Sequence, residues 1–278
     1  MLVGVVGAGT MGAGIAEVFA RAEGFTVQLA DINLEYATRG RNRQIAGLEK
    51  QVARGKMTEE RKDAIAADLL LAEIHDLRDC DLVIEAVLET MDVKRPLFET
   101  LDGIMKEGAI LASNTSSLSI TELARGLKHD VVGMHFFNPA PVMKLVEVTA
   151  GATTKPETVA AVTKIAHDLG KTSVACEEAV GFVVNRILVP MINEAIGVFA
   201  DGVASAEDID EAMKLGANHP IGPLALGDLI GLDVTLAIME VLQAETGDPK
   251  YRAHPLLRKY VRAGWLGRKT GRGFFTYA

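Results

Sequence analysis

The feature that most constrains the fold is a glycine motif near the start of the chain, Gly7-x-Gly9-x-x-Gly12, set between two apolar patterns. Residues 2–6 carry no polar side chain, which is typical of a strand buried on both faces of a parallel sheet. Residues 11–22 then repeat apolar side chains at the spacing of an amphipathic helix. A strand, a glycine turn and a helix in this order predict the first half of a dinucleotide-binding unit.

Each glycine of the motif has a separate physical role in such a unit. Gly7 makes the turn, Gly9 lets a pyrophosphate approach the backbone, and Gly12 allows the helix to pack closely on the strand. The phosphates are expected at the helix N-terminus, where free N–H groups and the helix dipole favour anions. A second apolar run, residues 27–30, ends at Asp31, nineteen positions after Gly12. An acidic residue there accepts hydrogen bonds from the adenosine ribose and repels a 2′-phosphate, so NAD is favoured over NADP.

The bulk properties describe an ordinary globular protein with a negative net charge. Of the 278 residues, 49% are hydrophobic and 24% are charged, and 29 basic against 37 acidic side chains give a formal charge of −8. This balance argues against nucleic acid or an anionic membrane surface as the main partner. Only Cys80 and Cys176 are present, in no metal-type spacing, so we expect a reduced compartment, no structural disulfide and no metal site. With no targeting pattern and no apolar run long enough to span a bilayer, a cytoplasmic location is expected.

Alternating strand and helix patterns continue as far as residue 169. Further strands are expected at residues 81–87, 109–113, 131–135 and 145–148. Helices are expected at residues 93–105, 119–126 and 155–169. Roughly forty residues after Asp31 also have a helical pattern, in which Thr58 is a predicted N-cap. This order predicts a mostly parallel sheet covered by helices.

Beyond Gly181 the pattern changes to apolar helices. We therefore divide the chain into a dinucleotide-binding domain, residues 1–180, and a helical domain, residues 181–278. Helical patterns cover residues 182–199, 205–215 and 224–242, and one strand is expected at residues 273–277. Helices this apolar on every side are buried, either inside a domain or against another subunit. Because about a hundred residues hide such surface poorly, we expect a homodimer through this domain, with a self-contained bundle as the alternative.

The best candidate for proton transfer is His135, which ends an apolar strand at the edge where such sheets bind ligands. A lone histidine in this setting is often a buried residue with a structural hydrogen bond, and that alternative stays open. Glu147 favours the catalytic interpretation, because a carboxylate inside the apolar run 145–148 needs a partner. If the two strands are neighbours, Glu147 can orient the imidazole of a general base. The histidines in polar settings are predicted at the surface: His75, His129, His167 and His254.

Two polar segments complete the candidate site. Residues 113–117, Ser-Asn-Thr-Ser-Ser, end a strand at the same edge, where a hydroxyl could bond a reacting oxygen; a polar turn that caps the next helix is the alternative. Basic residues crowd one segment of the otherwise acidic chain: Arg39, Arg41, Arg43, Lys50, Arg54 and Lys56. Lys50 and Arg54 are four positions apart and share one helix face. Such a face is either solvated surface or a handle for an anionic substrate such as a nucleotide phosphate.

Taken together, these segments resemble the 3-hydroxyacyl-CoA dehydrogenase family, and most closely its short bacterial members that act on 3-hydroxybutyryl-CoA. The resemblance runs from residue 1 to the C-terminus and rests on Gly-Ala-Gly-Thr-Met-Gly (7–12), Ala-Ser-Asn-Thr-Ser-Ser-Leu (112–118) and Met-His-Phe-Phe-Asn-Pro-Ala-Pro-Val-Met-Lys-Leu-Val-Glu (134–147). It continues in Gly-Phe-Val-Val-Asn-Arg (181–186), Met-Lys-Leu-Gly-Ala-Asn-His-Pro-Ile-Gly-Pro (213–223) and Gly-Arg-Lys-Thr-Gly-Arg-Gly-Phe (267–274). The family implies a Rossmann-like α/β domain with an inserted helical hairpin, followed by an all-α domain that dimerises. It also implies NAD-dependent interconversion of 3-hydroxyacyl-CoA and 3-oxoacyl-CoA.

The resemblance also implies roles for individual residues. His135 would be the general base oriented by Glu147, and Ser116 and Asn185 would hydrogen-bond the substrate oxygens. The residues implied for NAD are Gly7, Gly9, Thr10, Met11, Gly12, Asp31, Glu89, Lys94, Ser116, Asn138 and Lys269. The positions implied for the CoA phosphates are Lys50 and Arg54. Family members often have Lys where Arg54 stands, and some have Ser in place of Gly47; these departures concern the CoA contacts and leave the catalytic residues unaffected.

Two other functions stay open on the sequence. A hydroxy-acid dehydrogenase of the same superfamily that does not use CoA would share the NAD site, but the basic face around Lys50 and Arg54 argues against it. A catalytically silent NAD-binding protein would share the fold, but the complete catalytic set argues against that function. Oxidation of NADH with acetoacetyl-CoA separates all three.

Overall fold

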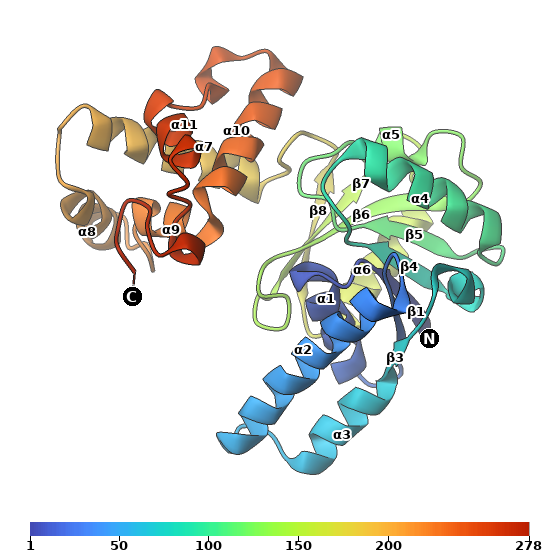
Figure 1. Ribbon diagram of the computed structural model, residues 1–278. Coiled ribbons are helices and arrows are strands. Elements are labelled where there is room, and N and C mark those ends of the chain that lie inside the picture. The colour runs from blue at the N-terminus through green and yellow to red at the C-terminus, as the bar shows by residue number, and fades with distance from the viewer. Residues whose placement is uncertain (278) are drawn as a thin grey trace. The chain divides into compact units, whose positions relative to one another are not determined.

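The computed structural model describes residues 1–277 and forms two compact units, Met1–Ala179 and a second one that begins at Val180 (Figure 1). The first unit is built on one eight-stranded sheet with the strand order β3-β2-β1-β4-β5-β6-β7-β8. The strands are β1 (Leu2–Val6), β2 (Thr26–Ala30), β3 (Leu69–Leu71), β4 (Leu82–Glu85), β5 (Ile110–Ser113), β6 (Asp130–Phe136), β7 (Leu145–Ala150) and β8 (Thr172–Glu177). Every neighbouring pair is parallel except β6 and β7, which are antiparallel. The predicted Rossmann-like, mostly parallel sheet is confirmed.

Helices cover both faces of this sheet. They are α1 (Thr10–Arg21), α2 (Leu34–Ala53), α3 (Glu59–Asp68), α4 (Met91–Ile104), α5 (Ile120–Ala124) and α6 (Pro156–Asp168), with a 3₁₀ segment at Ile74–Asp79. Successive side chains of a strand point to opposite faces, so β1 contributes to two apolar layers. Val5 lies in the layer formed with α1 and α6, and Val6 lies in the layer formed with α4 and α5. The sheet is thus buried between two helical layers, as its continuous apolar strands predict.

The helices α2 and α3 form a hairpin that is inserted between β2 and β3 and projects from the sheet (Figure 1). Local signals set where they start: the Asn33 side chain accepts the N–H of Tyr36, and the Thr58 side chain accepts the N–H of Arg61. Leu48 and Ile65 are buried in the α1 layer and attach the hairpin to the sheet. The inserted hairpin and the Thr58 cap are confirmed.

The two edge strands of the sheet were not predicted. β3 has three residues and pairs with β2, and β8 pairs with β7 at the opposite edge. Neither is a buried apolar run, because Leu70 and Leu71 are exposed and β8 has no buried residue. β3 is apolar but only three residues long and directly follows α3, so its leucines do not distinguish a strand from the end of a helix. β8 has no buried side chain, and its sequence carries a weak hydrophobic signal.

The second unit is helical, and the prediction of an all-α C-terminal domain is confirmed. Its helices are α7 (Val184–Ala200), α8 (Ala206–Gly216), α9 (Pro223–Ile230), α10 (Leu232–Thr246) and α11 (Pro255–Arg262), with 3₁₀ segments at Pro249–Tyr251 and Arg268–Thr270. The single helix predicted at residues 224–242 is wrong, because Gly231 has φ +106° and separates α9 from α10. The strand predicted at residues 273–277 is also wrong, since this part of the chain makes only isolated bridges. Nowhere in residues 1–277 is a helix long and apolar enough to cross a membrane.

Candidate active site

The glycine loop joins β1 to α1 at the carboxyl end of the sheet, next to the loop that follows β4. Gly7 has φ +101°, and a Cβ there would lie 2.5 Å from the carbonyl oxygen of Ala86, so a larger residue does not fit. A Cβ at Gly12 would lie 1.7 Å from the carbonyl oxygen of Gly7. By contrast, a Cβ at Gly9 would meet nothing within 4 Å. Packing inside the protein therefore does not require glycine at position 9, whereas close approach of a ligand to the backbone does.

The first turn of α1 offers an anion site beside this loop. The helix starts with Thr10 and Met11, and its N-cap, Gly9, has no side chain to bond the free N–H groups. Asp31 follows β2 and accepts a hydrogen bond from the N–H of Ala8 at 2.6 Å, which places its carboxylate against the glycine loop. An open glycine, an uncapped helix start and an acidic residue after β2 fit a dinucleotide, with its pyrophosphate at the helix and its ribose at Asp31.

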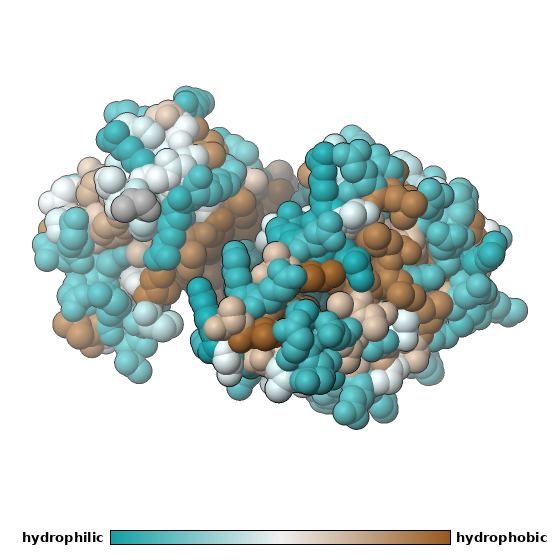
Figure 2. All heavy atoms as spheres, turned by 60° about the horizontal axis from the view of Figure 1, so that its bottom comes forward, coloured by the Kyte–Doolittle hydropathy of each residue, from teal (hydrophilic) through white to brown (hydrophobic). Residues whose placement is uncertain are grey.

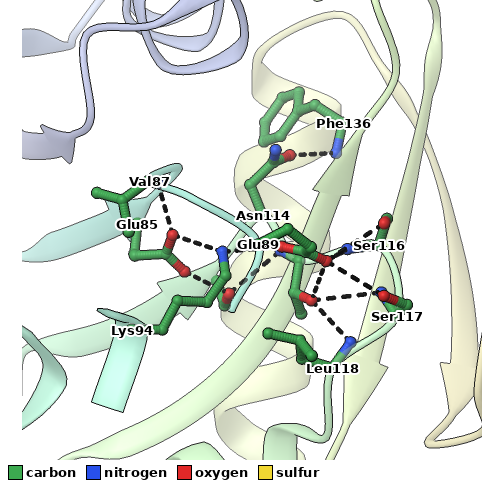
Figure 3. A network of polar contacts seen from close by, with 11 residues as sticks. Glu85, Val87, Glu89, Lys94, Asn114, Ser116, Ser117, Leu118 and Phe136 are labelled. Carbon is green, nitrogen blue, oxygen red and sulfur yellow. Dashed lines mark hydrogen bonds and ion pairs between the residues drawn. The ribbon is translucent and has the colours of Figure 1, made fainter. Parts of the chain in front are cut away.

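A network of charged and hydroxyl groups joins the carboxyl ends of β4 and β5 (Figure 3). At its centre, the Lys94 ammonium lies 2.6 Å from Glu85 Oε1 and 3.0 Å from Glu89 Oε2. The other oxygen of Glu89 accepts hydrogen bonds from the Thr115 hydroxyl at 2.6 Å and from the Ser116 N–H at 2.7 Å. The structure thus brings together three residues named by the sequence, Glu89, Lys94 and Ser116.

Burial and charge act differently on the two carboxylates of this network. Glu85 is 0% exposed and Lys94 is 1% exposed. Burial raises the pKa of Glu85, although the attraction of Lys94 opposes the shift. Burial also acts on Glu89, but the attraction of Lys94 and the hydrogen bonds from the loop after β5 outweigh it and lower the pKa of Glu89. Glu85 was not among the predicted site residues; its signal is a carboxylate in an apolar strand, the same signal that indicated Glu147.

His135 and Glu147 face each other across the antiparallel strands β6 and β7, where they are direct register partners. The Nδ1 atom of His135 lies 2.8 Å from Glu147 Oε2, and the residues are 6% and 1% exposed. The ring of Phe137 packs against the imidazole, with 4.4 Å between the ring centroids. The expectation that the two strands are neighbours is confirmed. In a neutral imidazole whose Nδ1 donates to a carboxylate, Nε2 carries the lone pair that can accept a proton.

One hydrogen bond ties the loop after β5 to β6. The Asn114 side chain accepts the N–H of Phe136 at 2.8 Å (Figure 3). Asn114 lies two positions before Ser116, and Phe136 directly follows His135, so this bond connects the segments that carry the two candidate residues. Asn138 follows β6 and is exposed. The candidate residues of the first unit, the hairpin cations excepted, therefore gather at one edge of the sheet. The carboxyl ends of the parallel strands β1, β2, β4, β5 and β6 form this edge together with the amino half of β7, and open α/β sheets bind ligands there.

Comparison with known proteins shows the family of this chain. Residues 2–179 match the 3-hydroxyacyl-CoA dehydrogenase NAD-binding domain, and residues 181–277 match the C-terminal domain of the same enzymes. The chain belongs to the 3-hydroxyacyl-CoA dehydrogenase family. It is 53% identical to the 3-hydroxybutyryl-CoA dehydrogenase of Clostridioides difficile over 285 aligned positions, which cover 100% of this chain and 99% of that one.

Two solved structures have the same fold as this chain over nearly their full length. The crystal structure of (S)-3-hydroxybutyryl-CoA dehydrogenase from Ralstonia eutropha is 49% identical, with a TM-score of 0.94 over 100% of this chain and 99% of that one. The structure of FadB2 from Mycobacterium tuberculosis is 45% identical, with a TM-score of 0.96 over 99% of this chain and 98% of that one. The family uses NAD, so the dinucleotide that fits the glycine loop is NAD.

The basic segment of α2 separates into two groups in the structure. Arg41 donates to the carbonyl oxygens of Leu69 and Ala66, and Arg43 donates to that of Ala8, so both brace the hairpin against the sheet. The side chains of a second group are exposed and make no hydrogen bond or ion pair within residues 1–277: Lys50, Arg54 and Lys56. The free basic face is therefore smaller than the sequence suggested, because Arg41 and Arg43 bond backbone carbonyl groups and Arg39 pairs with Glu35. Lys50 and Arg54 remain part of it.

The predicted residues of the second unit lie near the ends of two of its elements. Asn185 is in the first turn of α7 and is half-buried. The Lys269 ammonium lies 2.6 Å from a carboxylate oxygen of Asp233, at the start of α10. Asp228, which the sequence did not indicate, is 1% exposed and accepts the N–H groups of Phe274 and Phe275, both at 3.0 Å. It thereby holds the turn that carries Lys269.

Two histidines predicted at the surface are in fact engaged by the protein. The His129 side chain is 8% exposed, and its Nδ1 atom lies 2.8 Å from Asp102 Oδ1, just before β6. The His254 side chain accepts the N–H of Leu256 and caps α11. Both predictions rested on the polar residues next to each histidine in the sequence. Such neighbours do not reveal a partner elsewhere, such as the Asp102 carboxylate for His129 or the start of α11 for His254. His75 and His167 are exposed as expected.

Proposed function

We propose that this protein interconverts 3-hydroxybutyryl-CoA and acetoacetyl-CoA by hydride transfer with NAD(H), with His135 as the general base of the oxidation. Membership of an NAD-dependent 3-hydroxyacyl-CoA dehydrogenase family supports the reaction class. The names of relatives that align over nearly their whole length support the four-carbon substrate. The observation that carries the residue assignment is the buried His135–Glu147 hydrogen bond of 2.8 Å at the ligand-binding edge of the sheet.

His135 moves the proton in this proposal. Its Nδ1–H donates to Glu147, which fixes the tautomer and leaves Nε2 to take the proton of the 3-hydroxyl group. NAD supplies the acceptor for the hydride that leaves the same carbon. The imidazolium formed at His135 is stabilised by the Glu147 carboxylate, because the pair is buried and the attraction is weakly screened. In the reductive direction the same imidazolium gives the proton back to the new hydroxyl group.

Hydrogen bonds to the substrate oxygen polarise the carbonyl group in the reductive direction. Ser116 is proposed for this role, since Glu89 and Lys94 hold it at the carboxyl end of β5. Asn185 of α7 is proposed as the second donor. The thioester itself undergoes no chemistry, so neither residue needs to act as a nucleophile.

The dinucleotide is proposed to lie along the carboxyl ends of β1, β2 and β4. The open face of Gly9 and the uncapped start of α1 support a pyrophosphate there, next to the turn formed by Gly7 and Gly12. Thr10 and Met11 begin the helix that receives it. Asp31 is proposed to bind the adenosine ribose and to exclude NADP. The remaining proposed contacts are Glu89, Ser116, Asn138 and Lys269. Lys94 is 1% exposed, so its proposed part in the NAD site is to hold Glu89, 3.0 Å away.

The CoA phosphates are proposed to bind Lys50 and Arg54. Both side chains are exposed at the end of α2, one helical turn apart, and have no acidic partner in residues 1–277. A net charge of −8 would otherwise repel a polyanionic substrate, so two unpaired cations on one face favour this position.

The helical unit is proposed to form a homodimer, in a cytoplasmic enzyme. On its visible face in Figure 2, apolar side chains lie among hydrophilic ones. The exposed large hydrophobic residues of this unit are Val183, Ile187, Val203, Leu215, Leu229 and Val234. Apolar surface of this kind on a small helical unit favours burial against a second copy.

One assay tests the proposed reaction. Purified protein with acetoacetyl-CoA should consume NADH stoichiometrically, and the His135→Gln variant should lower kcat by roughly 10²–10⁴-fold while it still binds NADH. Consumption of NADH with a free hydroxy- or oxo-acid but not with the thioester would contradict a CoA substrate. Retention of more than half of the turnover by His135→Gln would contradict the assignment of the base.

A further inference from the structure

We propose that Glu85 is a positioning residue of the reaction, which fixes the Ser116 hydroxyl through two chains of contacts from inside the edge of the sheet. This inference rests on the proposed function, because that function assigns Ser116 to the substrate oxygen. Glu85 is 0% exposed, so it touches neither substrate nor cofactor itself. Any effect it has on the reaction must pass through its neighbours.

The first chain of contacts runs through Lys94. Glu85 Oε1 lies 2.6 Å from the Lys94 ammonium, which in turn lies 3.0 Å from Glu89 Oε2 (Figure 3). Glu89 then accepts the N–H of Ser116 at 2.7 Å and its hydroxyl at 3.2 Å. One ammonium group is thus shared between two carboxylates, and the position of Glu89 depends on how strongly Glu85 attracts the other side of Lys94.

The second chain runs through the strand next to β4. Glu85 Oε2 accepts the Ser113 hydroxyl at 2.6 Å, and the oxygen of that hydroxyl accepts the N–H of Thr115 at 3.1 Å. Thr115 precedes Ser116 in the chain. Glu85 also accepts the N–H of Val87 at 2.7 Å, in the loop that carries Glu89. The two carboxylate oxygens of Glu85 thus contact both the loop after β4, which carries Glu89, and the end of β5, which leads to Ser116.

A buried carboxylate is costly unless it is paired and hydrogen-bonded, as Glu85 is. The donors that meet the Glu85 carboxylate come from the loop after β4, the last residue of β5 and the start of α4. The Glu85→Gln variant keeps the shape and one oxygen but removes the charge. Its amide group would present N–H donors to the Ser113 hydroxyl, and Lys94 would be attracted by Glu89 alone. Both changes should draw Glu89 and Thr115 away from the positions that orient Ser116.

A double-mutant cycle tests this. Loss of a hydrogen bond to a charged group in the orienting chain should lower kcat of Glu85→Gln by about 10- to 100-fold. In the Ser116→Ala background the same substitution should cost less than about threefold, because the residue it positions is gone. The dissociation constant of NADH, measured by fluorescence titration, should change less than kcat. The matched control is Glu17→Gln, since Glu17 is also buried, pairs with Arg21 at 2.7 Å and has no bond to the network; its kcat should stay at the wild-type value.

The outcomes separate this proposal from the function on which it rests. If Ser116→Ala lowers kcat but Glu85→Gln multiplies the loss by the same factor in both backgrounds, Glu85 does not act through Ser116 and the positioning role is overturned. A larger loss in NADH binding than in kcat would overturn it as well. If Ser116→Ala has no effect on kcat, the assignment of Ser116 in the proposed function fails first, and this inference falls with it. Should Glu85→Gln not fold, Ser113→Ala breaks the second chain alone and should show the same non-additivity with Ser116→Ala.

Discussion

The substitution Glu147→Gln removes the charge that faces His135 and keeps the shape of the side chain. Hydrogen bonds to charged groups contribute about 1.5–3 kcal/mol, and each 1.4 kcal/mol is tenfold in rate, so kcat should fall by roughly 10- to 150-fold. The upper part of this range is expected, because Glu147 is 1% exposed and little water replaces the lost charge. The fall should be smaller than that of His135→Gln, since the imidazole remains in place.

The chain contains a matched control for this experiment in the pair His129–Asp102. The distance between the ring Nδ1 and the carboxylate oxygen is 2.8 Å in both pairs, and both histidine side chains are 8% exposed. The control pair lies at the amino end of β6, away from the carboxyl ends of the strands. Asp102→Asn should therefore lower the melting temperature and leave kcat unchanged.

The assay is the initial rate of NADH oxidation at saturating acetoacetyl-CoA, with the melting temperature measured on the same samples. The reasoning is refuted if Glu147→Gln and Asp102→Asn lower kcat to a similar extent, because both effects would then follow from stability. It is also refuted if Glu147→Gln keeps more than half of the wild-type turnover.

Four further predictions follow from the structure. NADH should give a higher kcat/KM than NADPH, and Asp31→Ser should narrow the difference, because the carboxylate that repels the 2′-phosphate is gone. The double variant Lys50→Ala/Arg54→Ala should raise KM for acetoacetyl-CoA with kcat little changed, since the phosphates do not change during hydride transfer; the effect should shrink as salt rises. Ile187→Glu, at a position that is 67% exposed, should shift sedimentation from dimer to monomer. Burial opposes ionisation of Asp102, but hydrogen bonds from His129 and Lys128 outweigh this effect and lower the pKa of Asp102 below the usual 3.8. The ionised Asp102 therefore stabilises the folded protein above pH 3.8, and this contribution is lost as the pH falls through the lower pKa of the folded state. On acidification, Asp102→Asn should thus lose less free energy of unfolding than the wild type, as measured by urea unfolding.

Two of these predictions have a control variant within the same chain, and all four have an outcome that refutes them. Arg39→Ala lies on the same helix as Lys50 but pairs with Glu35, so it should leave KM for acetoacetyl-CoA unchanged. An equal rise of KM for a short thioester without the nucleotide would contradict the CoA assignment. Ile32→Glu, at a 76% exposed position of the first unit, should leave the dimer intact, and a monomeric wild type would refute the dimer. Equal kcat/KM values for NADH and NADPH would refute the prediction on cofactor choice. Parallel dependence of unfolding free energy on pH for Asp102→Asn and the wild type would refute the prediction on Asp102.

The parts of the fold that the sequence predicted are those fixed by local physics. The turn at Gly7 needs a positive φ, and the start of α3 needs the Thr58 side chain as a cap. Such signals lie within a few residues of the structure they cause, so one chain segment is enough to recognise them. The order of central strands and helices was also readable, because a strand buried on both faces is continuously apolar.

The tertiary structure alone decided which distant groups meet. His135 and Glu147 are register partners only because β7 runs antiparallel to β6, and the strand pattern is the same for either direction. Glu85, Lys94 and Ser116 belong to three elements that meet at one edge of the sheet. Edge strands pair on one side only: β3 is too short for its leucines to indicate a strand, and β8 has no buried side chain. Local propensity thus specified the elements of this protein, while strand pairing and burial decided which side chains form its site.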